Sequence, residues 1–235
     1  MISVRTITDT SDLREAVRLQ KIIWGFEDLE LLPVRLFVVS NKVGGQTMAA
    51  FDGEKMVGFL IAVPGIKTDG THYLHSNMMG VLADYRNLGV GRQLKLAQRE
   101  EALERGIEMI EWTFDPLEMK NAFFNVQRLG AVVERYVLNQ YGITSSLLHG
   151  GLPTDRCIAS WHLRSERVLR VVAGERAPMV EIVERIEVPN DIGPIRREIQ
   201  ASVSERFLEY LRRDLYVTGV ERGETHGVYL FAKRT

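Results

Sequence analysis

The segment Ala83–Leu94, which reads ADYRNLGVGRQL, constrains the fold of this chain more than any other. It follows a strand-like apolar run and precedes a stretch of helical periodicity that ends at Gly106. In such a strand–turn–helix unit, the N–H groups of the first helical turn have no intrahelical acceptor, and the helix dipole adds partial positive charge. Glycine lets the backbone approach an anion closely. Because Arg86 and Arg92 add charge-assisted contacts, the segment predicts a loop that holds a phosphate or pyrophosphate.

Two well-known phosphate loops do not fit this segment. A Walker loop requires lysine and then serine or threonine after its last glycine, whereas Gly91 is followed by Arg92. A dinucleotide fingerprint requires glycine or alanine three positions after the second glycine and directly follows the first strand. Here Leu94 occupies that position, and three strand signals come before the loop. The simplest alternative is a helix start at which Gly89 and Gly91 serve packing alone.

The periodicity of apolar residues predicts alternating strands and helices along the chain. Expected strands lie at residues 2–7, 48–63 (a hairpin around Asp52 and Gly53), 71–84, 109–114, 131–138, 157–163, 180–188, 216–221 and 227–233. Expected helices lie at residues 10–25, 33–43, 91–105, 115–130 and 194–213, with Thr10 or Ser11 as the first N-cap. This order predicts a mixed α/β (α+β) domain built on a sheet.

Charge and cysteine content narrow the class of protein. The 235 residues include 30 Lys and Arg against 31 Asp and Glu, so a broadly basic nucleic-acid-binding surface is not indicated. The single cysteine, Cys157, excludes an internal disulfide and a cysteine-based zinc site, and suits a reducing compartment. The sequence contains neither a bilayer-length apolar run nor the apolar core of a signal peptide near its start. We therefore expect a cytoplasmic protein with no metal, no nucleic-acid partner and no membrane partner.

The string RNLGVG, from Arg86 to Gly91, matches the pattern R/Q-x-x-G-x-G/A. It resembles the acyl-CoA-binding signature of the GCN5-related N-acetyltransferase (GNAT) superfamily, and the expected element order around it agrees. The resemblance implies the GNAT fold, a mixed and mostly antiparallel central sheet flanked by helices, as an acyl-CoA-binding core over residues 1–149. Residues 150–235 are then a C-terminal α/β extension packed on that core.

The resemblance also implies which residues hold the co-substrate, acetyl-CoA or another acyl-CoA. The pantetheine arm would pair with the backbone of the strand before the loop, at Met79, Gly80 and Val81. The pyrophosphate would lie on the loop and the first helical turn, at Arg86, Asn87, Leu88, Gly89, Val90, Gly91 and Arg92. Asn121 resembles a polar position near the pantetheine, and Phe124 could line the same helical face.

Strand alternation places Tyr73, His75, Asn77, Met79 and Val81 on one face of the strand before the loop. His75 lies four residues before Met79, at the relative position of a glutamate base in histone-type members of the family. Because histidine can accept a proton near neutral pH, His75 is the expected catalytic base for the amine. The alternative is a hydrogen-bonded structural histidine in a half-buried strand.

The general acid departs from the family pattern. Many members carry a tyrosine four residues before the glycine that closes the fourth helix, and counting back from Gly130 gives Val126. Either the thiolate leaves unaided, or Tyr136, Tyr141 or another group donates the proton, or the chain does not catalyse the usual transfer.

Two carboxylates on strand 109–114 and at its end could also take part. Glu111 and Asp115 share one face and could orient an ammonium substrate or relay a proton. As an N-cap before Pro116, however, Asp115 also has a purely structural explanation.

The leading hypothesis is an acyl-CoA-dependent N-acyltransferase, in the simplest case an acetyltransferase, that acts on a small-molecule amine by direct attack in a ternary complex. The alternative is a non-catalytic CoA-binding or interaction module on the same fold, because the usual tyrosine is missing. Residues 150–235 could complete the acceptor pocket, mediate a homodimer, or both.

Overall fold

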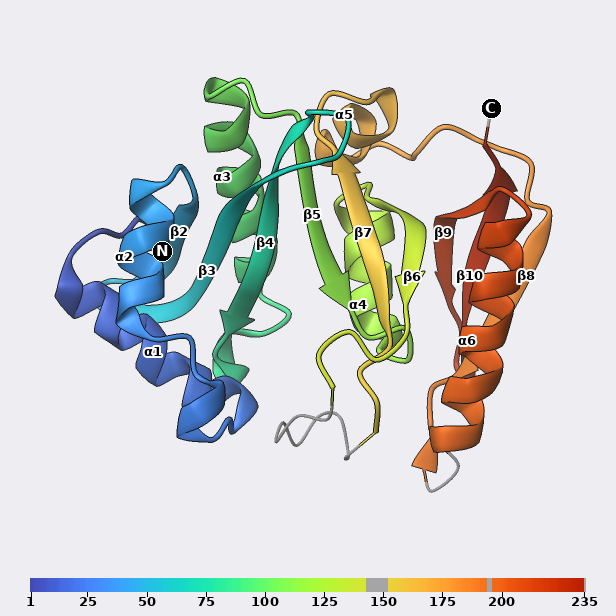
Figure 1. Ribbon diagram of the computed structural model, residues 1–235, viewed down its shortest axis with the longest axis horizontal. Helices are drawn as coiled ribbons and strands as arrows, with labels where there is room; N and C mark the ends of the chain where they lie inside the picture. The colour runs from blue at the N-terminus through green and yellow to red at the C-terminus, as the bar shows by residue number, and fades with distance from the viewer. Residues whose placement is uncertain (143–151, 194–195, 235) are drawn as a thin grey trace. The chain divides into compact units, whose positions relative to one another are not determined.

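Strands and helices follow one another in the computed structural model in nearly the order that the periodicity predicts (Figure 1). The structure describes residues 1–142, 152–193 and 196–234. The first half contains β1 (Ile2–Thr6), α1 (Thr10–Trp24), α2 (Val34–Lys42), β2 (Gln46–Asp52), β3 (Lys55–Ile66), β4 (His72–Val81), α3 (Val90–Glu104) and β5 (Met109–Phe114). The second half contains α4 (Met119–Phe123), β6 (Val132–Val137), β7 (Arg156–His162), α5 (Glu166–Val172), β8 (Glu184–Pro189), α6 (Arg196–Arg212), β9 (Leu215–Arg222) and β10 (His226–Lys233). The prediction of a mixed α/β fold is confirmed.

Internal contacts divide the chain into two compact units, and the division falls inside β5. The first unit holds Met1–Glu111, and the second holds the described residues from Trp112 onward. The expected boundary between residues 149 and 150 lies outside the described residues. The extent of the C-terminal extension therefore stays a prediction.

In the first unit, β1, β2, β3 and β4 are neighbours in that order and run antiparallel to one another. β4 then pairs in parallel with the start of β5, at Leu74 with Ile110 and at His75 with Glu111. The predicted hairpin is the β2–β3 pair. The sheet of this unit is thus mostly antiparallel with one parallel neighbour.

Helices cover both faces of this first sheet (Figure 1). On one face, Leu13 of α1 and Phe37 of α2 pack with Phe59 of β3 in a buried apolar cluster. On the other face, Val90 and Leu94 of α3 pack with residues of β2 and β3 in a second cluster. The start of α3 is therefore anchored in the core, which fixes the position of the loop before it.

A β-bulge in β4 interrupts the alternation that the sequence predicts. Ser76 pairs with Ala62 and Met78 pairs with Ile61, so Asn77 is an extra residue in β4. One additional residue shifts the alternation of side chains by one position. Residues before the bulge therefore face the opposite side of the sheet from the one that a regular strand, continued from the residues after the bulge, would give them.

Because of the bulge, the candidate base His75 faces the opposite side of the sheet from Met79. Met79 packs with the α3 cluster, and Ser76 faces α3 as well, because its Oγ accepts a hydrogen bond from Lys95 Nζ at 2.8 Å. His75 and Tyr73 therefore point to the other face, which carries α1 and α2. The expectation that residues 73, 75, 77, 79 and 81 share one face is wrong, because it assumed a regular strand.

In the second unit, the strand order is the end of β5, then β7, β6, β9, β10 and β8. β6 is antiparallel to β7 and meets β9 at Val133 and Val217. The predicted terminal hairpin is confirmed as the β9–β10 pair, and β8 lies on the far side of β10. The register of β6 against β7 shifts between Val133 and Arg135, which makes Glu134 a second bulge residue.

Aromatic side chains form the core beneath α6. Phe207 is fully buried, and its ring stacks on Tyr136 at 4.8 Å between centroids. The rings of Tyr229 and Phe231 meet Phe207 edge-on at 5.0 and 5.3 Å. Edge-on aromatic packing of this kind stabilises a core beyond simple area burial. The amphipathic helix predicted over residues 194–213 is thus α6, held on its sheet by Phe207.

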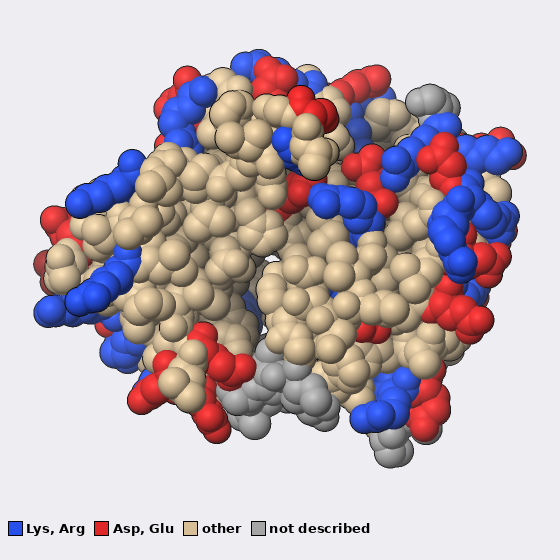
Figure 2. Space-filling model, in the orientation of Figure 1, with Lys and Arg blue, Asp and Glu red and all other residues tan. Residues whose placement is uncertain are grey.

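Positive and negative side chains are interspersed on the face shown in Figure 2. This mixture agrees with the near balance of 30 basic and 31 acidic residues. Within the described ranges, helices of the length and apolarity needed to cross a membrane are not found. The same residues contain no group of three or more His, Cys, Asp or Glu placed to hold a metal ion.

Candidate active site

The glycine loop leads from β4 into α3 through two residues with left-handed backbone conformation. Ala83–Tyr85 form a 3₁₀ turn, Asn87 has a φ of 64°, and Gly89, the N-cap of α3, has a φ of 82°. A Cβ built at Gly89 would meet no heavy atom within 4 Å among the described residues. The backbone at Gly89 is therefore open to a ligand, which is what a phosphate cradle requires.

The N–H groups of the first turn of α3 lie next to this open position. The Gln93 N–H donates to the Gly89 carbonyl oxygen at 3.0 Å, as the first hydrogen bond of the helix. The N–H groups of Val90 and Gly91 precede it and so have no acceptor inside the helix. These donors and the positive end of the helix dipole can bind an oxyanion.

The two arginines of the loop differ in their surroundings. Arg86 is exposed, and its Nε donates to the Val81 carbonyl oxygen at 3.2 Å, which turns the side chain back along the end of β4. The guanidinium keeps further N–H donors beyond this one. Arg92 is half-buried in the first turn of α3, whereas Asn87 and Leu88 are exposed. The predicted pyrophosphate residues thus lie together in the first unit.

The predicted pantetheine strand is the end of β4. Met79–Val81 pair antiparallel with Gly58–Leu60 of β3. Gly80 is buried, and a Cβ there would lie 2.6 Å from a ring atom of Trp24 and 2.8 Å from Ile23 Cδ1. Gly80 therefore lets α1 approach the strand, and the role of these residues toward an acyl-CoA stays a prediction.

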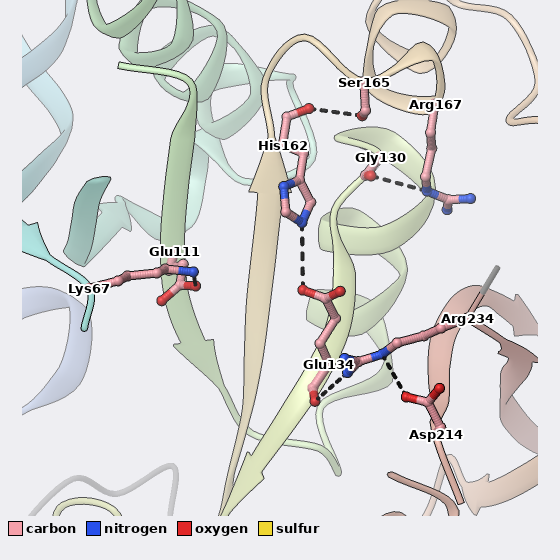
Figure 3. Close-up of polar contacts among 9 residues, drawn as sticks. All are labelled: Lys67, Glu111, Gly130, Glu134, His162, Ser165, Arg167, Asp214 and Arg234. Atoms are coloured by element: carbon pink, nitrogen blue, oxygen red, sulfur yellow. Dashed lines mark hydrogen bonds and ion pairs between the residues drawn. The ribbon is translucent and has the colours of Figure 1, made fainter. Parts of the chain in front are cut away.

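A second group of titratable side chains lies where β4 and β5 pair. His75 and Glu111 are register partners in the parallel pair, so they leave the same face on strands about 5 Å apart. Glu111 is only 3% exposed, and its Oε1 accepts a hydrogen bond from Lys67 Nζ at 2.7 Å (Figure 3). Lys67 Nζ also lies 5.7 Å from the centre of the Tyr73 ring. A buried carboxylate paired with an ammonium beside His75 can hold a cationic amine or stabilise an imidazolium.

Asp115 is occupied by structural contacts in the turn after β5. Its Oδ1 accepts the Leu117 N–H at 2.8 Å, and its Oδ2 accepts Arg196 Nη2 at 3.0 Å. The helix begins at Met119 rather than at Pro116, so the predicted N-cap instead closes a turn over its own backbone. A catalytic role for Asp115 stays a prediction, but both of its oxygens already have partners.

Tyr136 and Tyr141 have opposite environments in the second unit. Tyr136 is buried, its hydroxyl lies 2.8 Å from Ser204 Oγ, and Ser204 donates to Asp155 Oδ2 at 2.7 Å. Burial raises the pKa of the Tyr136 hydroxyl well above its usual range. The Tyr141 side chain is exposed, and its hydroxyl lies 2.9 Å from Thr113 Oγ1 of β5. Of the two hydroxyls, the one on a solvent-exposed side chain is that of Tyr141.

The helix after β5 carries the remaining predicted residues. Val126, at the position of the usual tyrosine, is fully buried in the π-helical turn Phe124–Arg128. Asn121 is exposed, and its Oδ1 accepts Asn125 Nδ2 at 3.3 Å. Phe124 is half-buried. Both Asn121 and Phe124 belong to the second unit, and their predicted role beside the pantetheine stays untested.

The sequence matches the family described as Acetyltransferase (GNAT) family over residues 13–130, which is half of the chain. The chain belongs to the GNAT family. The match contains β4, the glycine loop, α3 and β5, so the resemblance drawn from RNLGVG is confirmed. The chain is accordingly an enzyme of the N-acetyltransferase class, with acyl transfer as its general chemistry. Comparison with curated proteins gave no match.

Solved structures agree on the GNAT fold. The ribosomal-protein-S18-alanine N-acetyltransferase of Escherichia coli is 17% identical with a TM-score of 0.54, covering 70% of this chain and 96% of that one. NAA60 of Arabidopsis thaliana, in complex with a bisubstrate analogue, is 14% identical with a TM-score of 0.56, covering 68% and 97%. The putative acetyltransferase yncA of Salmonella typhimurium, with its cofactor acetyl-CoA, is 13% identical with a TM-score of 0.56, covering 70% and 95%. At these identities the similarity concerns the fold.

Lys95 is a buried titratable residue of this GNAT chain that the sequence reasoning missed. It lies on α3 with 2% exposure, and its Nζ donates to Ser76 Oγ at 2.8 Å and to Gln98 Oε1 at 3.0 Å. Burial lowers its pKa to about 7. The available signal was a lysine directly after Leu94 on the apolar stripe of α3. The contact to Ser76 joins α3 to β4 one residue before the bulge.

Lys67 was also missed by the sequence reasoning. It lies in the turn after β3, where no periodic pattern of apolar residues indicates that its side chain has a buried partner.

Replacement of Lys95 by methionine should change how stability depends on pH. The folded pKa of about 7 lies below the ordinary value of 10.5, so between these pH values the unfolded chain binds more protons than the folded one. The free energy of unfolding of the wild type should therefore rise from pH 7 to pH 9, by at most about 1.4 kcal/mol per pH unit from this group. Urea unfolding at both pH values should show a smaller rise in Lys95→Met.

Lys42→Met is the matched control, because Lys42 lies in the last turn of α2 with an exposed side chain. It should keep the pH dependence of the wild type. An equally steep rise in Lys95→Met would show that Lys95 is not the titrating group.

Proposed function

We propose that this GNAT enzyme transfers an acyl group, in the simplest case acetyl from acetyl-CoA, to the amine of a small molecule by direct attack in a ternary complex. The observation that carries the proposal is the glycine loop. Its left-handed residues Asn87 and Gly89 open the backbone beside the first turn of α3, where N–H donors and the helix dipole favour a pyrophosphate. Arg86 supplies a nearby positive charge at the end of β4.

The pantetheine arm would extend along Met79–Val81 of β4, which pair with β3 on one edge. Backbone N–H and C=O groups of a strand can pair with an amide-containing chain as they pair with another strand.

In the chemical step, the amine lone pair forms the new C–N bond, the thioester C–S bond breaks, and the CoA thiolate leaves. His75 would accept the proton of the attacking amine, and the buried Glu111 on the neighbouring strand would stabilise the resulting imidazolium. A backbone N–H of β4, which is bulged at Asn77, would stabilise the oxyanion. The thiolate either leaves unaided or takes a proton from a group such as Tyr141.

Calorimetric titration of the full chain with acetyl-CoA, desulfo-CoA and succinyl-CoA tests the donor side. Saturable one-site binding of all three is expected, because the loop would recognise the pyrophosphate that they share. The ranking of acetyl-CoA against succinyl-CoA then indicates the acyl group. Absence of binding by every CoA species would overturn the pyrophosphate cradle and leave the loop with a packing role.

Turnover of a panel of amines tests the acceptor side. The panel contains amino acids and other small amines in one arm and peptides with free N-termini in the other. The peptide arm is included because the Escherichia coli enzyme of the same fold is a ribosomal-protein-S18-alanine N-acetyltransferase. Transfer to a small amine supports the proposal, whereas transfer to peptides alone would overturn the acceptor class. CoA binding without any turnover would support the alternative of a non-catalytic module.

We also propose that the reaction takes place in the cytoplasm and that residues 150–235 form an extension of the GNAT core. The single cysteine, which is buried, supports a reducing compartment. The homologous match ends at residue 130, and the solved structures cover about 70% of the chain, which supports a separate C-terminal part. Sedimentation of the purified protein tests whether that part forms a homodimer.

A further inference from the structure

The second unit contains an open pocket, lined by both apolar surface and charged side chains, that the acyl-transfer chemistry does not use. Its volume is about 520 Å³, within the range of small-molecule sites. Polar side chains of its lining come from β6, the end of β7, the start of α5 and the residue after β10: Glu134, His162, Ser165, Arg167 and Arg234 (Figure 3). Tyr216 of β9 also lines it. All of them belong to the second unit, so the pocket is defined without reference to the first.

Arg167 brings a half-buried positive charge to this pocket. Its Nε donates to the Gly130 carbonyl oxygen at 3.0 Å, its Nη1 to Thr218 Oγ1 at 3.0 Å, and its Nη2 to the Val126 carbonyl oxygen at 3.2 Å. These acceptors, the ones it has among the described residues, are all uncharged. Burial lowers the pKa of the Arg167 guanidinium, because desolvation disfavours its charged form. An arginine has five N–H donors, so two remain for a ligand.

Arg234 adds a second guanidinium at the rim. One of its nitrogens donates to the Glu134 carbonyl oxygen at 3.2 Å, and its Nε lies 3.6 Å from Asp214 Oδ1. Arg234 is 42% exposed at its side chain and Asp214 is 75% exposed, so this ion pair is weak. Arg234 can therefore turn part of its donor set toward an anion in the pocket at little cost.

Glu134 supplies a negative group to the same pocket. As the bulge residue of β6, it leaves the regular ladder, and its carboxylate meets the His162 ring at 3.5 Å (Figure 3). The hydrogen bond from His162 holds the pKa of Glu134 below its usual range, against the opposing effect of burial. Glu134 is thus an anion that can accept a further hydrogen bond from a ligand. Two arginines and one glutamate line the described walls, which suits a ligand with an anionic and a donor group.

We propose that this pocket binds a small carboxylic acid that also carries an amino or hydroxyl group, with its carboxylate on Arg167 and Arg234 and its donor on Glu134. A planar carboxylate matches the paired donors of a guanidinium. A phosphate would bring more negative charge close to the Glu134 carboxylate and has no amino group to pair with that carboxylate. An amino or hydroxy acid therefore fits the charges of the pocket better. The site belongs to the second unit alone and does not depend on the proposed transfer.

The test is calorimetry of the full chain with each of the twenty standard amino acids, followed by the hydroxy-acid and deamino counterparts of the tightest binder. At least one amino acid should bind saturably at one site. The deamino counterpart should bind more weakly than the other two, because it leaves Glu134 without a donor. Inorganic phosphate is titrated in parallel. Phosphate binding with no amino or hydroxy acid binding would overturn the ligand class.

Arg234→Gln assigns the binding to the pocket. Arg234 is exposed, so the variant should keep the wild-type midpoint of thermal unfolding, whereas Arg167 holds three backbone and side-chain acceptors and its variants could unfold. Affinity for the amino acid should fall about tenfold or more on loss of this charge-assisted contact. Arg170→Gln, on the same helix as Arg167 but paired with Glu166 and Glu175, is the matched control and should bind as the wild type.

His75→Ala separates this pocket from an amino-acid acceptor site in the first unit. Binding that persists in His75→Ala and falls in Arg234→Gln supports the pocket. Binding that persists unchanged in folded Arg234→Gln overturns it, as does the absence of saturable binding by any amino acid. Either result leaves CoA binding and turnover as independent tests of the proposed function.

Discussion

Gly89→Val should lower the affinity for acetyl-CoA by about 100-fold while the chain stays folded. A hundredfold loss corresponds to about 3 kcal/mol, the contribution of one or two hydrogen bonds to a charged group. Gly89 has a φ of 82° at the N-cap of α3, and the space beside it is open among the described residues. The valine side chain would enter that space, where the proposed pyrophosphate lies against the N–H groups of Val90 and Gly91. Calorimetric titration of the variant with acetyl-CoA measures the loss.

The control for backbone strain lies at the other end of the same helix. Gly106 follows α3 with a φ of 75°, and a Cβ there would likewise meet nothing within 4 Å. A β-branched residue in the left-handed region costs roughly 1–2 kcal/mol at either position. Gly106→Val should therefore lose as much stability as Gly89→Val but bind acetyl-CoA like the wild type. Normal affinity in a folded Gly89→Val would remove the basis of the proposed cradle.

Elements that a local residue type decides could be predicted from the sequence. The β2–β3 hairpin turns at Gly53 with a φ of 59°, α1 is closed by Gly25 with a φ of 70°, and Gly106, two residues after the end of α3, has a φ of 75°. At each point the chain needs a left-handed residue, and glycine adopts that conformation without strain. The helix start at the loop was correct to within one residue, since α3 begins at Val90.

Features that depend on partners far along the chain could not be predicted. The bulge at Asn77 arises from the pairing of β4 with β3, and the residue type at position 77 does not predict a bulge. The ion pair between Lys67 and Glu111 joins residues 44 positions apart. α5 has only seven residues, Glu166–Val172, too few for helical periodicity to emerge. The sequence thus identified His75 as the candidate base, but only the structure shows which face of the sheet its side chain occupies.

His75→Ala should lower kcat by about 100-fold or more and leave the affinity for acetyl-CoA unchanged. The expected size is that of general base catalysis. His75 is half-buried on the α1 and α2 face of β4, with Glu111 as its register partner, whereas the loop that would bind the pyrophosphate lies beyond the end of the same strand. Because a base accepts a proton only in its neutral form, kcat/KM of the wild type should rise with pH through the titration of the base. The variant should lose that part of the pH profile, and steady-state kinetics with the best amine of the panel measures it.

His72→Ala is the matched control for this variant. His72 lies on the same strand, is exposed, and pairs with Ile66 of β3. It precedes Tyr73 directly, so its side chain leaves the opposite face from Tyr73 and His75. Its removal should leave kcat and the pH profile intact. A folded His75→Ala with wild-type turnover at every pH would dismiss His75 as the base and transfer that role to another group, whereas loss of CoA affinity in the same variant would mean that His75 shapes the strand that holds the donor.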